Sequence, residues 1–145
     1  MALAAIVTDL IFSTKIVTEA RAQKRQVRVL RSYSVLSEFL RATPPDMLIV
    51  DMNCGGINPL SAITLAKTSK PSCKIVAYLS HTQQDLAQQA MQAGAEQVVP
   101  RSEFVVLLPT WVQTYADAAA VSQQAGIENV SEARSGPAGV QPKSL

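Results

Sequence analysis

The feature that most constrains the fold is an alternation of short apolar runs with longer amphipathic stretches over most of the chain. Parallel strands need a crossover connection, usually a helix, so strands that alternate with helices predict βαβ units. We therefore expect a doubly wound, five-stranded parallel sheet in a three-layer α/β/α sandwich. The expected strands cover residues 3–7, 27–30, 47–50, 74–79 and 98–99.

Local signals mark where the intervening helices begin and end. Asn58 is a capping residue, and Pro59 suits the first helical position because proline has a fixed φ and no N–H. Ser34 and Thr82 are expected to cap two further helices, and Gly94 is expected to end the second of these. Helices are also expected over 13–24 and 104–115, where Pro109 should kink or divide the last one.

The chain of 145 residues is long enough for one domain of ordinary size. Periodicity ends near residue 120, after which Ser, Gln, Gly, Pro and Ala dominate. We expect a folded domain over residues 1–119 and a flexible C-terminal tail over residues 120–145.

Composition argues against several classes of partner. The formal net charge is only +2, which gives no reason to expect nucleic acid or an anionic membrane as the main partner. The N-terminus lacks the basic leading region of a signal peptide, and no run approaches the ~20 apolar residues of a membrane span. Cys54 and Cys73 are too few for a disulfide framework, so a cytoplasmic protein is expected.

Polar residues follow the expected strands, at the edge of the sheet where α/β proteins gather functional groups. Thr8 and Asp9 follow the first strand, and Asp51 and Asn53 follow the third within LIVDMN. Ser80 and His81 follow the fourth strand, and Arg101 and Ser102 follow the fifth. Two carboxylates, a hydroxyl and a cation are therefore expected to converge.

This set of strand-end residues resembles the receiver domain of bacterial two-component response regulators. The resemblance covers roughly residues 3–118 and rests on TD at 8–9, LIVDMN at 48–53, VAYLS at 76–80 and GAEQVVPRSEF at 94–104. It implies the flavodoxin-like receiver topology and a role in phosphorelay signalling. It also implies protein partners such as a histidine kinase, a phosphotransfer protein or an effector, and a possible homodimer through the last helices.

The resemblance further implies a role for each strand-end residue. Asp51 matches the aspartate that accepts a phosphoryl group, and Ser80 matches the switch hydroxyl. Asp9, Asp51 and the carbonyl of Asn53 match the ligands of Mg²⁺, a cation that prefers oxygen ligands. Arg101 falls where the family has a lysine. No enzymatic activity is expected beyond self-phosphorylation and dephosphorylation of Asp51.

Four positions depart from the family pattern. Thr8 replaces one of two acidic residues, which lowers the expected Mg²⁺ affinity. Arg101 keeps the charge of the lysine but not its shape. His81 stands where a small residue usually leaves the phosphoacceptor accessible, and Val98 stands where an aromatic residue reports the phosphorylation state. In addition, the proline that the family usually has directly after the lysine is displaced, since Pro100 precedes Arg101 here.

Each residue also has a structural interpretation. An aspartate after a strand is often a turn or helix-capping residue, a serine there satisfies backbone groups, and an arginine forms surface ion pairs. Trp111 and Tyr115 are expected to pack inward. The basic run formed by Arg21, Lys24, Arg25, Arg28 and Arg31 indicates a solvated face, or alternatively a docking surface for an acidic partner.

Two functions therefore stay open. The favoured one is a stand-alone, atypical or pseudo-receiver that signals through protein–protein interaction. The alternative is a receiver that is phosphorylated on Asp51 with Mg²⁺ in a phosphorelay. A small-molecule site at the same sheet edge has no supporting motif, since no phosphate-binding glycine pattern follows the first strand.

Overall fold

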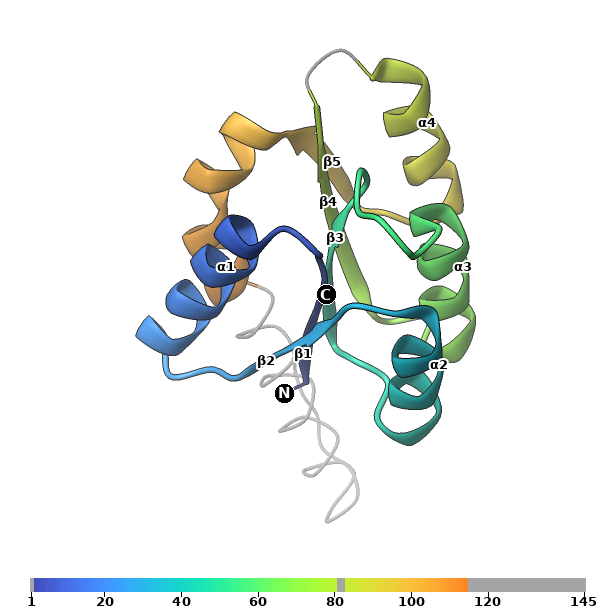
Figure 1. The fold of residues 1–145 in the computed structure, drawn as a ribbon, viewed down its shortest axis with the longest axis horizontal. Helices are drawn as coiled ribbons and strands as arrows, with labels where there is room; N and C mark the ends of the chain where they lie inside the picture. Colours follow the sequence, from blue (N-terminus) through green and yellow to red (C-terminus); the bar gives the residue numbers. More distant parts are fainter. Residues whose placement is uncertain (1, 81–82, 115–145) are drawn as a thin grey trace, which may run out of the picture.

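A computed structural model describes residues 2–80 and 83–114. His81, Thr82, Tyr115 and the expected tail over 120–145 lie outside the described residues. Five parallel strands form one sheet in the order β2-β1-β3-β4-β5 (Figure 1). The strands are β1 (Leu3–Ile6), β2 (Val27–Leu30), β3 (Met47–Asp51), β4 (Lys74–Leu79) and β5 (Gln97–Pro100). This is the predicted receiver-type, flavodoxin-like α/β fold.

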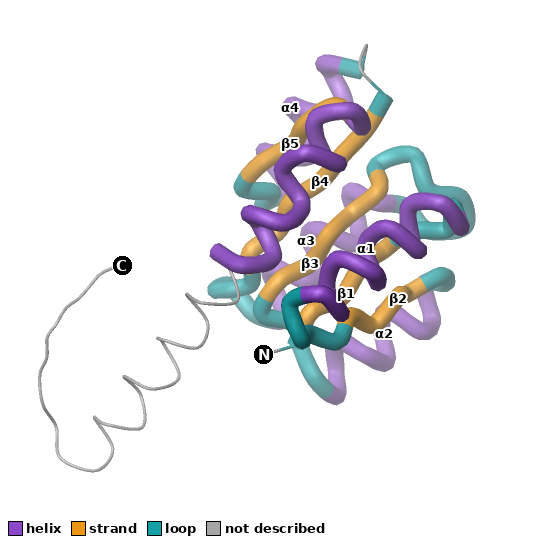
Figure 2. Tube along the Cα trace, turned by 90° about the vertical axis from the view of Figure 1, so that its left-hand side faces the viewer, coloured by secondary structure: helices purple, strands orange, loops and turns teal. Residues whose placement is uncertain are grey.

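Helices cover both faces of the sheet (Figures 1 and 2). The helix over residues 101–114 lies with α1 on one face, and α2, α3 and α4 cover the other. Each face has its own apolar core, because almost every residue of the inner strands is buried. The labelled helices are α1 (Leu10–Ala22), α2 (Tyr33–Ala42), α3 (Pro59–Ser69) and α4 (Gln84–Ala93).

Several local predictions are confirmed. The Asn58 side chain accepts hydrogen bonds from the N–H groups of Leu60 and Ser61, and Pro59 occupies the first turn of α3. β4 has the predicted bounds. Gly94 ends α4 with φ +131°, and a Cβ atom there would lie 2.6 Å from the Lys67 side chain, so only glycine fits without rearrangement.

The starts of α1, α2 and α4 differ from the prediction. α1 begins at Leu10 rather than Ser13, because the Asp9 side chain caps it by accepting from the N–H of Phe12 at 3.0 Å. α2 is capped by Ser32 rather than Ser34, since the Ser32 hydroxyl accepts from the N–H of Val35. The N-cap position of α4 is Gln83, whose side chain makes no capping hydrogen bond, and the predicted cap residue Thr82 lies outside the described residues.

The last helix begins earlier than predicted and is not divided. Residues 101–114 are helical throughout, including Pro109. Proline removes one backbone donor, and the carbonyl of Pro109 accepts a hydrogen bond from the side chain of Gln23 at the end of α1 at 2.9 Å. Trp111 is buried in the core beneath this helix, as predicted. No helix in the described part of the chain has both the length and the hydropathy of a membrane span.

Candidate functional site

Asp51 is the last residue of β3 and lies at the carboxyl end of the sheet. It is only 3% exposed. One carboxylate oxygen accepts a hydrogen bond from the backbone N–H of Asn53 at 2.8 Å. Burial raises the pKa of this carboxyl above its ordinary value, against the lowering effects of the Asn53 N–H, the Arg101 charge and the Tyr78 hydroxyl. The end of β3 therefore places the Asp51 carboxylate in a largely enclosed site.

Tyr78 is the residue of β4 that pairs in register with Asp51. Neighbouring residues at the same register of a parallel sheet direct their side chains to the same face. The ring of Tyr78 is fully buried and stacks against Phe104 with 4.3 Å between ring centroids and against Phe12 with 5.2 Å. Its hydroxyl oxygen is buried and has no partner within normal hydrogen-bond geometry among the described residues.

The charge of Asp51 acts on this tyrosine. Burial raises the pKa of Tyr78, and the negative charge of Asp51 raises it further. The tyrosine hydroxyl therefore stays protonated and offers a donor toward the carboxylate. Tyr78 is not among the residues predicted for the site, although it is a hydroxyl-bearing residue two positions before Ser80 in an apolar strand.

Arg101 opens the last helix and lies on the same face of the sheet. Its guanidinium carbon is 5.1 Å from the centroid of the Phe12 ring, a cation–π contact. Its Nε atom is buried and has no hydrogen-bond partner within the described residues. The positive charge of Arg101 lowers the pKa of Asp51, yet these two described side chains form no ion pair at salt-bridge distance. A bidentate pair between Arg101 and Asp51, which would fill the site permanently, is therefore not formed.

The residues after β1 are engaged in local structure. Asp9 is exposed and caps α1, which is the structural interpretation of a strand-end carboxylate. The Thr8 hydroxyl accepts a hydrogen bond from the N–H of Gly55 at 3.3 Å, and the Thr8 carbonyl accepts one from Arg31 at 3.4 Å. Arg31, one residue of the basic run, thus reaches this edge of the sheet from the end of β2.

Ser80 and Asn53 form a polar network with Gln83 beside Asp51. The Asn53 side-chain oxygen accepts from the Ser80 N–H at 3.1 Å, and the Ser80 hydroxyl lies 3.5 Å from the same oxygen. The Gln83 side-chain oxygen accepts from the Asn53 amide at 2.9 Å and from the Ser80 N–H at 3.2 Å. The Ser80 hydroxyl therefore contacts the Asn53 side chain, and within the described residues no hydrogen bond joins it to the Asp51 carboxylate.

The five predicted site residues thus gather at one edge of the sheet, but through different contacts. Asn53 bonds Asp51 directly, Asp9 and Arg101 act on it through their charges, and Ser80 is linked to it through Asn53. Cys54 is a further neighbour, and burial together with the Asp51 charge raises the pKa of its thiol to about 11. This thiol is therefore protonated at neutral pH and is a poor nucleophile.

Comparison with known protein families shows to which family this chain is related. The response regulator receiver domain family matches residues 6–104, which is most of the described chain. The chain belongs to the response regulator receiver domain family. A search of curated proteins finds no match.

Solved receiver structures share the fold at low sequence identity. A receiver domain of a putative LuxO repressor protein from Vibrio parahaemolyticus is 13% identical, with a TM-score of 0.72 over 86% of this chain and 95% of that one. An orphan response regulator of H. pylori is 14% identical, with a TM-score of 0.67 over 79% and 95%. A Burkholderia pseudomallei response regulator that carries a phosphorylated aspartic acid and a calcium ion is 19% identical, with a TM-score of 0.65 over 88% and 74%.

The residues that the resemblance assigns to a magnesium site also make contacts within this receiver domain. The resemblance assigns the metal to Asp9, Asp51 and the Asn53 carbonyl. Asp9 is engaged as a helix cap, Thr8 offers a hydroxyl bonded to Gly55, and Asp51 is buried. Within the described residues, no group of three or more acidic, histidine or cysteine side chains is placed to hold a metal ion.

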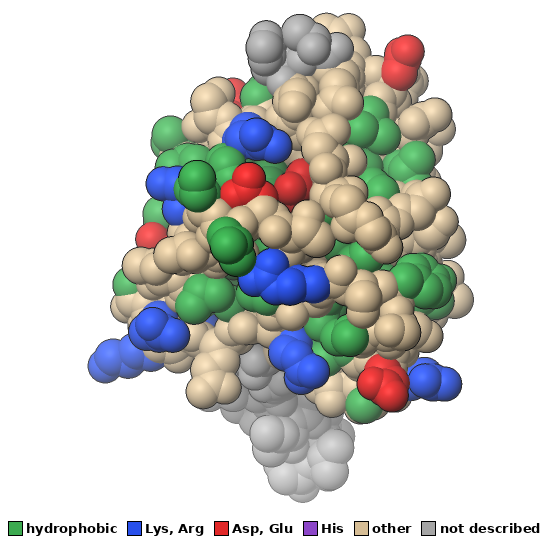
Figure 3. Space-filling view, in the orientation of Figure 1, with side chains coloured by type: hydrophobic (Ala, Val, Ile, Leu, Met, Phe, Trp, Pro, Cys, Tyr) green, Lys and Arg blue, Asp and Glu red, His purple; other side chains and the backbone are tan. Residues whose placement is uncertain are grey.

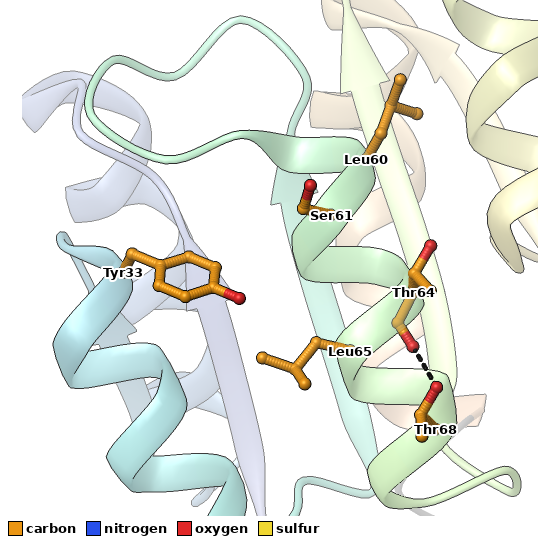
Figure 4. A pocket seen from close by; sticks show the side chains of 6 residues that line it. All are labelled: Tyr33, Leu60, Ser61, Thr64, Leu65 and Thr68. Carbon is orange, nitrogen blue, oxygen red and sulfur yellow. Dashed lines mark hydrogen bonds between the residues drawn. The ribbon is translucent and has the colours of Figure 1, made fainter.

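A shallow groove on the opposite face of this receiver domain lies between α2 and α3. Tyr33 points from α2 toward α3, and the Thr68 hydroxyl donates to the carbonyl of Thr64 at 2.9 Å (Figure 4). None of the predicted site residues lines it. Its lining residues are Tyr33, Leu60, Ser61, Thr64, Leu65 and Thr68.

Proposed function

We propose that this receiver domain is a pseudo-receiver, a signalling module that acts through protein–protein interaction without phosphorylation of Asp51. The observation that carries the proposal is the enclosure of Asp51, which is 3% exposed and whose pKa is raised by burial. A phosphoacceptor has to meet its donor in line and in ionised form. Burial opposes the in-line approach of a donor to the Asp51 carboxylate.

The surroundings of Asp51 support this proposal. The Thr8 hydroxyl supplies no charge to a cation, and Asp9 contributes only one exposed carboxylate. The Ser80 hydroxyl is held by Asn53, and a switch role would require it to leave that contact. Arg101 faces the Phe12 ring, which holds its charge away from a direct pair with Asp51.

The partner of such a module would be a protein that contacts α1 and the last helix. On this side of the molecule, apolar side chains reach the surface among basic ones (Figure 3). Leu10 is 71% exposed and Ile11 68% at the start of α1, and Val106 on the last helix is 75% exposed. Large apolar side chains that remain exposed are common features of interaction sites.

The second candidate is a phosphoaccepting receiver. It is favoured by one observation, namely that both Asp9 and Arg101 act electrostatically on Asp51. In that reaction an Asp51 carboxylate oxygen would attack the phosphorus atom of a phosphodonor, form an acyl phosphate and release the donor's leaving group. The phosphorylated aspartic acid of the Burkholderia pseudomallei relative is an example within the same fold.

Intact-protein mass spectrometry after incubation with acetyl phosphate and Mg²⁺ tests the proposal. A pseudo-receiver should keep its unmodified mass. A mass gain of one phosphoryl group that is absent in Asp51→Asn would overturn the proposal and establish the second candidate. A gain that persists in Asp51→Asn reports modification elsewhere and leaves the enclosed Asp51 unmodified, as proposed.

A further inference from the structure

A continuous aromatic stack connects the Asp51 site to the last helix. Phe12 on α1, Tyr78 on β4 and Phe104 on the last helix lie in contact, with centroid separations of 5.2 Å for Phe12–Tyr78 and 4.3 Å for Tyr78–Phe104. Trp111, further along the same helix, is 6.0 Å from Phe104. The rings of Tyr78, Phe104 and Trp111 are all 4% exposed or less.

The hydroxyl of Tyr78 lies close enough to the Asp51 carboxylate to lower its pKa. Tyr78 pairs with Asp51 in the β3–β4 ladder, and the Met52 N–H donates to the Tyr78 carbonyl at 2.9 Å, so the backbones fix this juxtaposition. The buried hydroxyl has no full hydrogen-bond partner among the described residues. Because an unsatisfied buried hydroxyl is costly, a hydrogen bond to Asp51 would stabilise the Tyr78 hydroxyl.

The stack lies on a different face of the sheet from position 98. Val98 packs with the core beneath α2, α3 and α4, whereas Tyr78 belongs to the core beneath α1 and the last helix. Valine at position 98 has no ring that could respond to the site. Tyr78, the aromatic residue next to Asp51, therefore faces one helical layer of the sandwich. Position 98, where the family has its aromatic reporter, faces the other layer.

We propose that Tyr78 is the residue that couples the state of the Asp51 carboxylate to the last helix, through its stack with Phe104 and Trp111. Packed rings have discrete arrangements, so a change in the acceptor at Asp51 repositions Tyr78 and then its two neighbours on the helix. Coupling of this kind is reciprocal, so a partner bound to the last helix also changes the Asp51 site. This role of Tyr78 does not depend on whether Asp51 is phosphorylated.

The single tryptophan of the chain makes the coupling measurable. The experiment compares four full-length proteins: the wild type, Asp51→Asn, Tyr78→Phe and the double variant. Asp51→Asn replaces the charged acceptor by a neutral group of the same shape, and Tyr78→Phe removes only the hydroxyl and keeps the ring. Trp111 fluorescence and the amide resonances of residues 101–114 are recorded at one pH.

Coupling predicts that Asp51→Asn shifts the Trp111 emission and the resonances of the last helix when Tyr78 is present. In the Tyr78→Phe background the same substitution should leave both signals unchanged. Tyr33→Phe removes a hydroxyl from a tyrosine that is 46% exposed on α2, and it should leave the Asp51→Asn response intact.

Two results would overturn the proposal. One is an Asp51→Asn response of the same size with and without the Tyr78 hydroxyl, which means that the signal bypasses Tyr78. The other is the absence of any Trp111 or helix response to Asp51→Asn in the wild-type background. Unchanged circular dichroism of the four proteins ensures that either result concerns coupling rather than folding.

Discussion

Asp51 and Tyr78 are register partners in neighbouring strands, and the carboxylate and the hydroxyl are buried on the same face of the sheet. This pairing puts a proton donor beside the predicted phosphoacceptor position. It also ties that position to the aromatic core under the last helix through Phe104. A change at either residue should therefore affect both the site and the core.

The stability of the core should depend strongly on the Tyr78 ring. Tyr78→Ala removes a fully buried ring that stacks on two others, and should lower the free energy of unfolding by about 3–5 kcal/mol. Urea unfolding followed by circular dichroism measures the change. Tyr33→Ala is the matched control. Because the Tyr33 ring is 46% exposed, its removal should lower the free energy of unfolding much less. Equal costs would mean that the stack contributes little.

The pH dependence of stability should reflect the burial of Asp51. Because burial raises its folded-state pKa above 3.8, the folded state holds this proton more tightly than the unfolded state. The stability that protonated Asp51 contributes is fully present below the pKa of this carboxyl in the unfolded state. It is lost as pH rises through the pKa of the carboxyl in the folded state. Asp51→Asn should therefore be more stable than the wild type at neutral pH, by roughly 1–3 kcal/mol, the usual cost of a poorly satisfied buried charge.

Urea unfolding of both proteins between acidic and neutral pH tests this expectation. The difference between Asp51→Asn and the wild type should vanish in acid, where the wild-type carboxyl is also neutral. A variant that is less stable than the wild type at neutral pH would show that the charged form of Asp51 is the favoured one.

Asp46 should show the opposite pH dependence. Burial alone would raise its pKa, but the hydrogen bond from Lys70, the Ala2 N–H and nearby positive charge outweigh burial and lower it below 3.8. The stability that the Asp46 carboxylate contributes is therefore present above the pKa of this group in the unfolded state. It is lost as pH falls through the pKa of the group in the folded state. Asp46→Asn should be less stable than the wild type by about 1 kcal/mol at neutral pH, as for a partly exposed ion pair.

The same urea series measures how the stability contributions of both Asp51 and Asp46 depend on pH. The difference between Asp46→Asn and the wild type should close in acid, whereas a difference that stays constant with pH would argue for a packing effect instead of a charge effect.

We predict that Thr8 limits the response of the Asp51 site to magnesium. Wild-type amide resonances around Asp51 should be insensitive to millimolar Mg²⁺, since Thr8 supplies no charge and Asp9 caps α1. Thr8→Asp adds a carboxylate next to Asp9 and should make those resonances respond to the cation, because Mg²⁺ prefers carboxylate oxygens. Thr8→Asn is the matched neutral control. A strong wild-type response, or equal responses of Thr8→Asp and Thr8→Asn, would contradict this role of Thr8.

Much of the fold could be predicted from the sequence because periodicity and capping are local signals. Asn58 and Pro59 mark the start of α3 correctly, and the apolar run at 74–79 gives the bounds of β4. The predicted start of α1 at residue 13 is wrong, because Asp9, which the strand-end pattern places at the functional edge, caps the helix. Pro109 does not divide the last helix, since packing overrides a local break.

The candidate site was harder to predict than the fold. The strand-end rule places Asp51, Asn53 and Arg101 at one edge, because it depends only on topology. It does not reveal that Ser80 bonds Asn53, or that Arg101 stacks on Phe12 instead of pairing with Asp51. These contacts depend on side-chain packing between distant segments, which no local pattern encodes.

The most direct test of the central claim is the response of the wild-type protein to beryllofluoride with Mg²⁺, a stable mimic of a phosphoryl group on aspartate. We predict that the amide resonances near Asp51 and Ser80 and along residues 101–114 stay at their positions. The reasons are that the Asp51 carboxylate is enclosed and that Thr8 leaves Asp9 as the one carboxylate directly after β1. Shifts at these positions that disappear in Asp51→Ala would contradict this claim and identify a phosphoaccepting receiver.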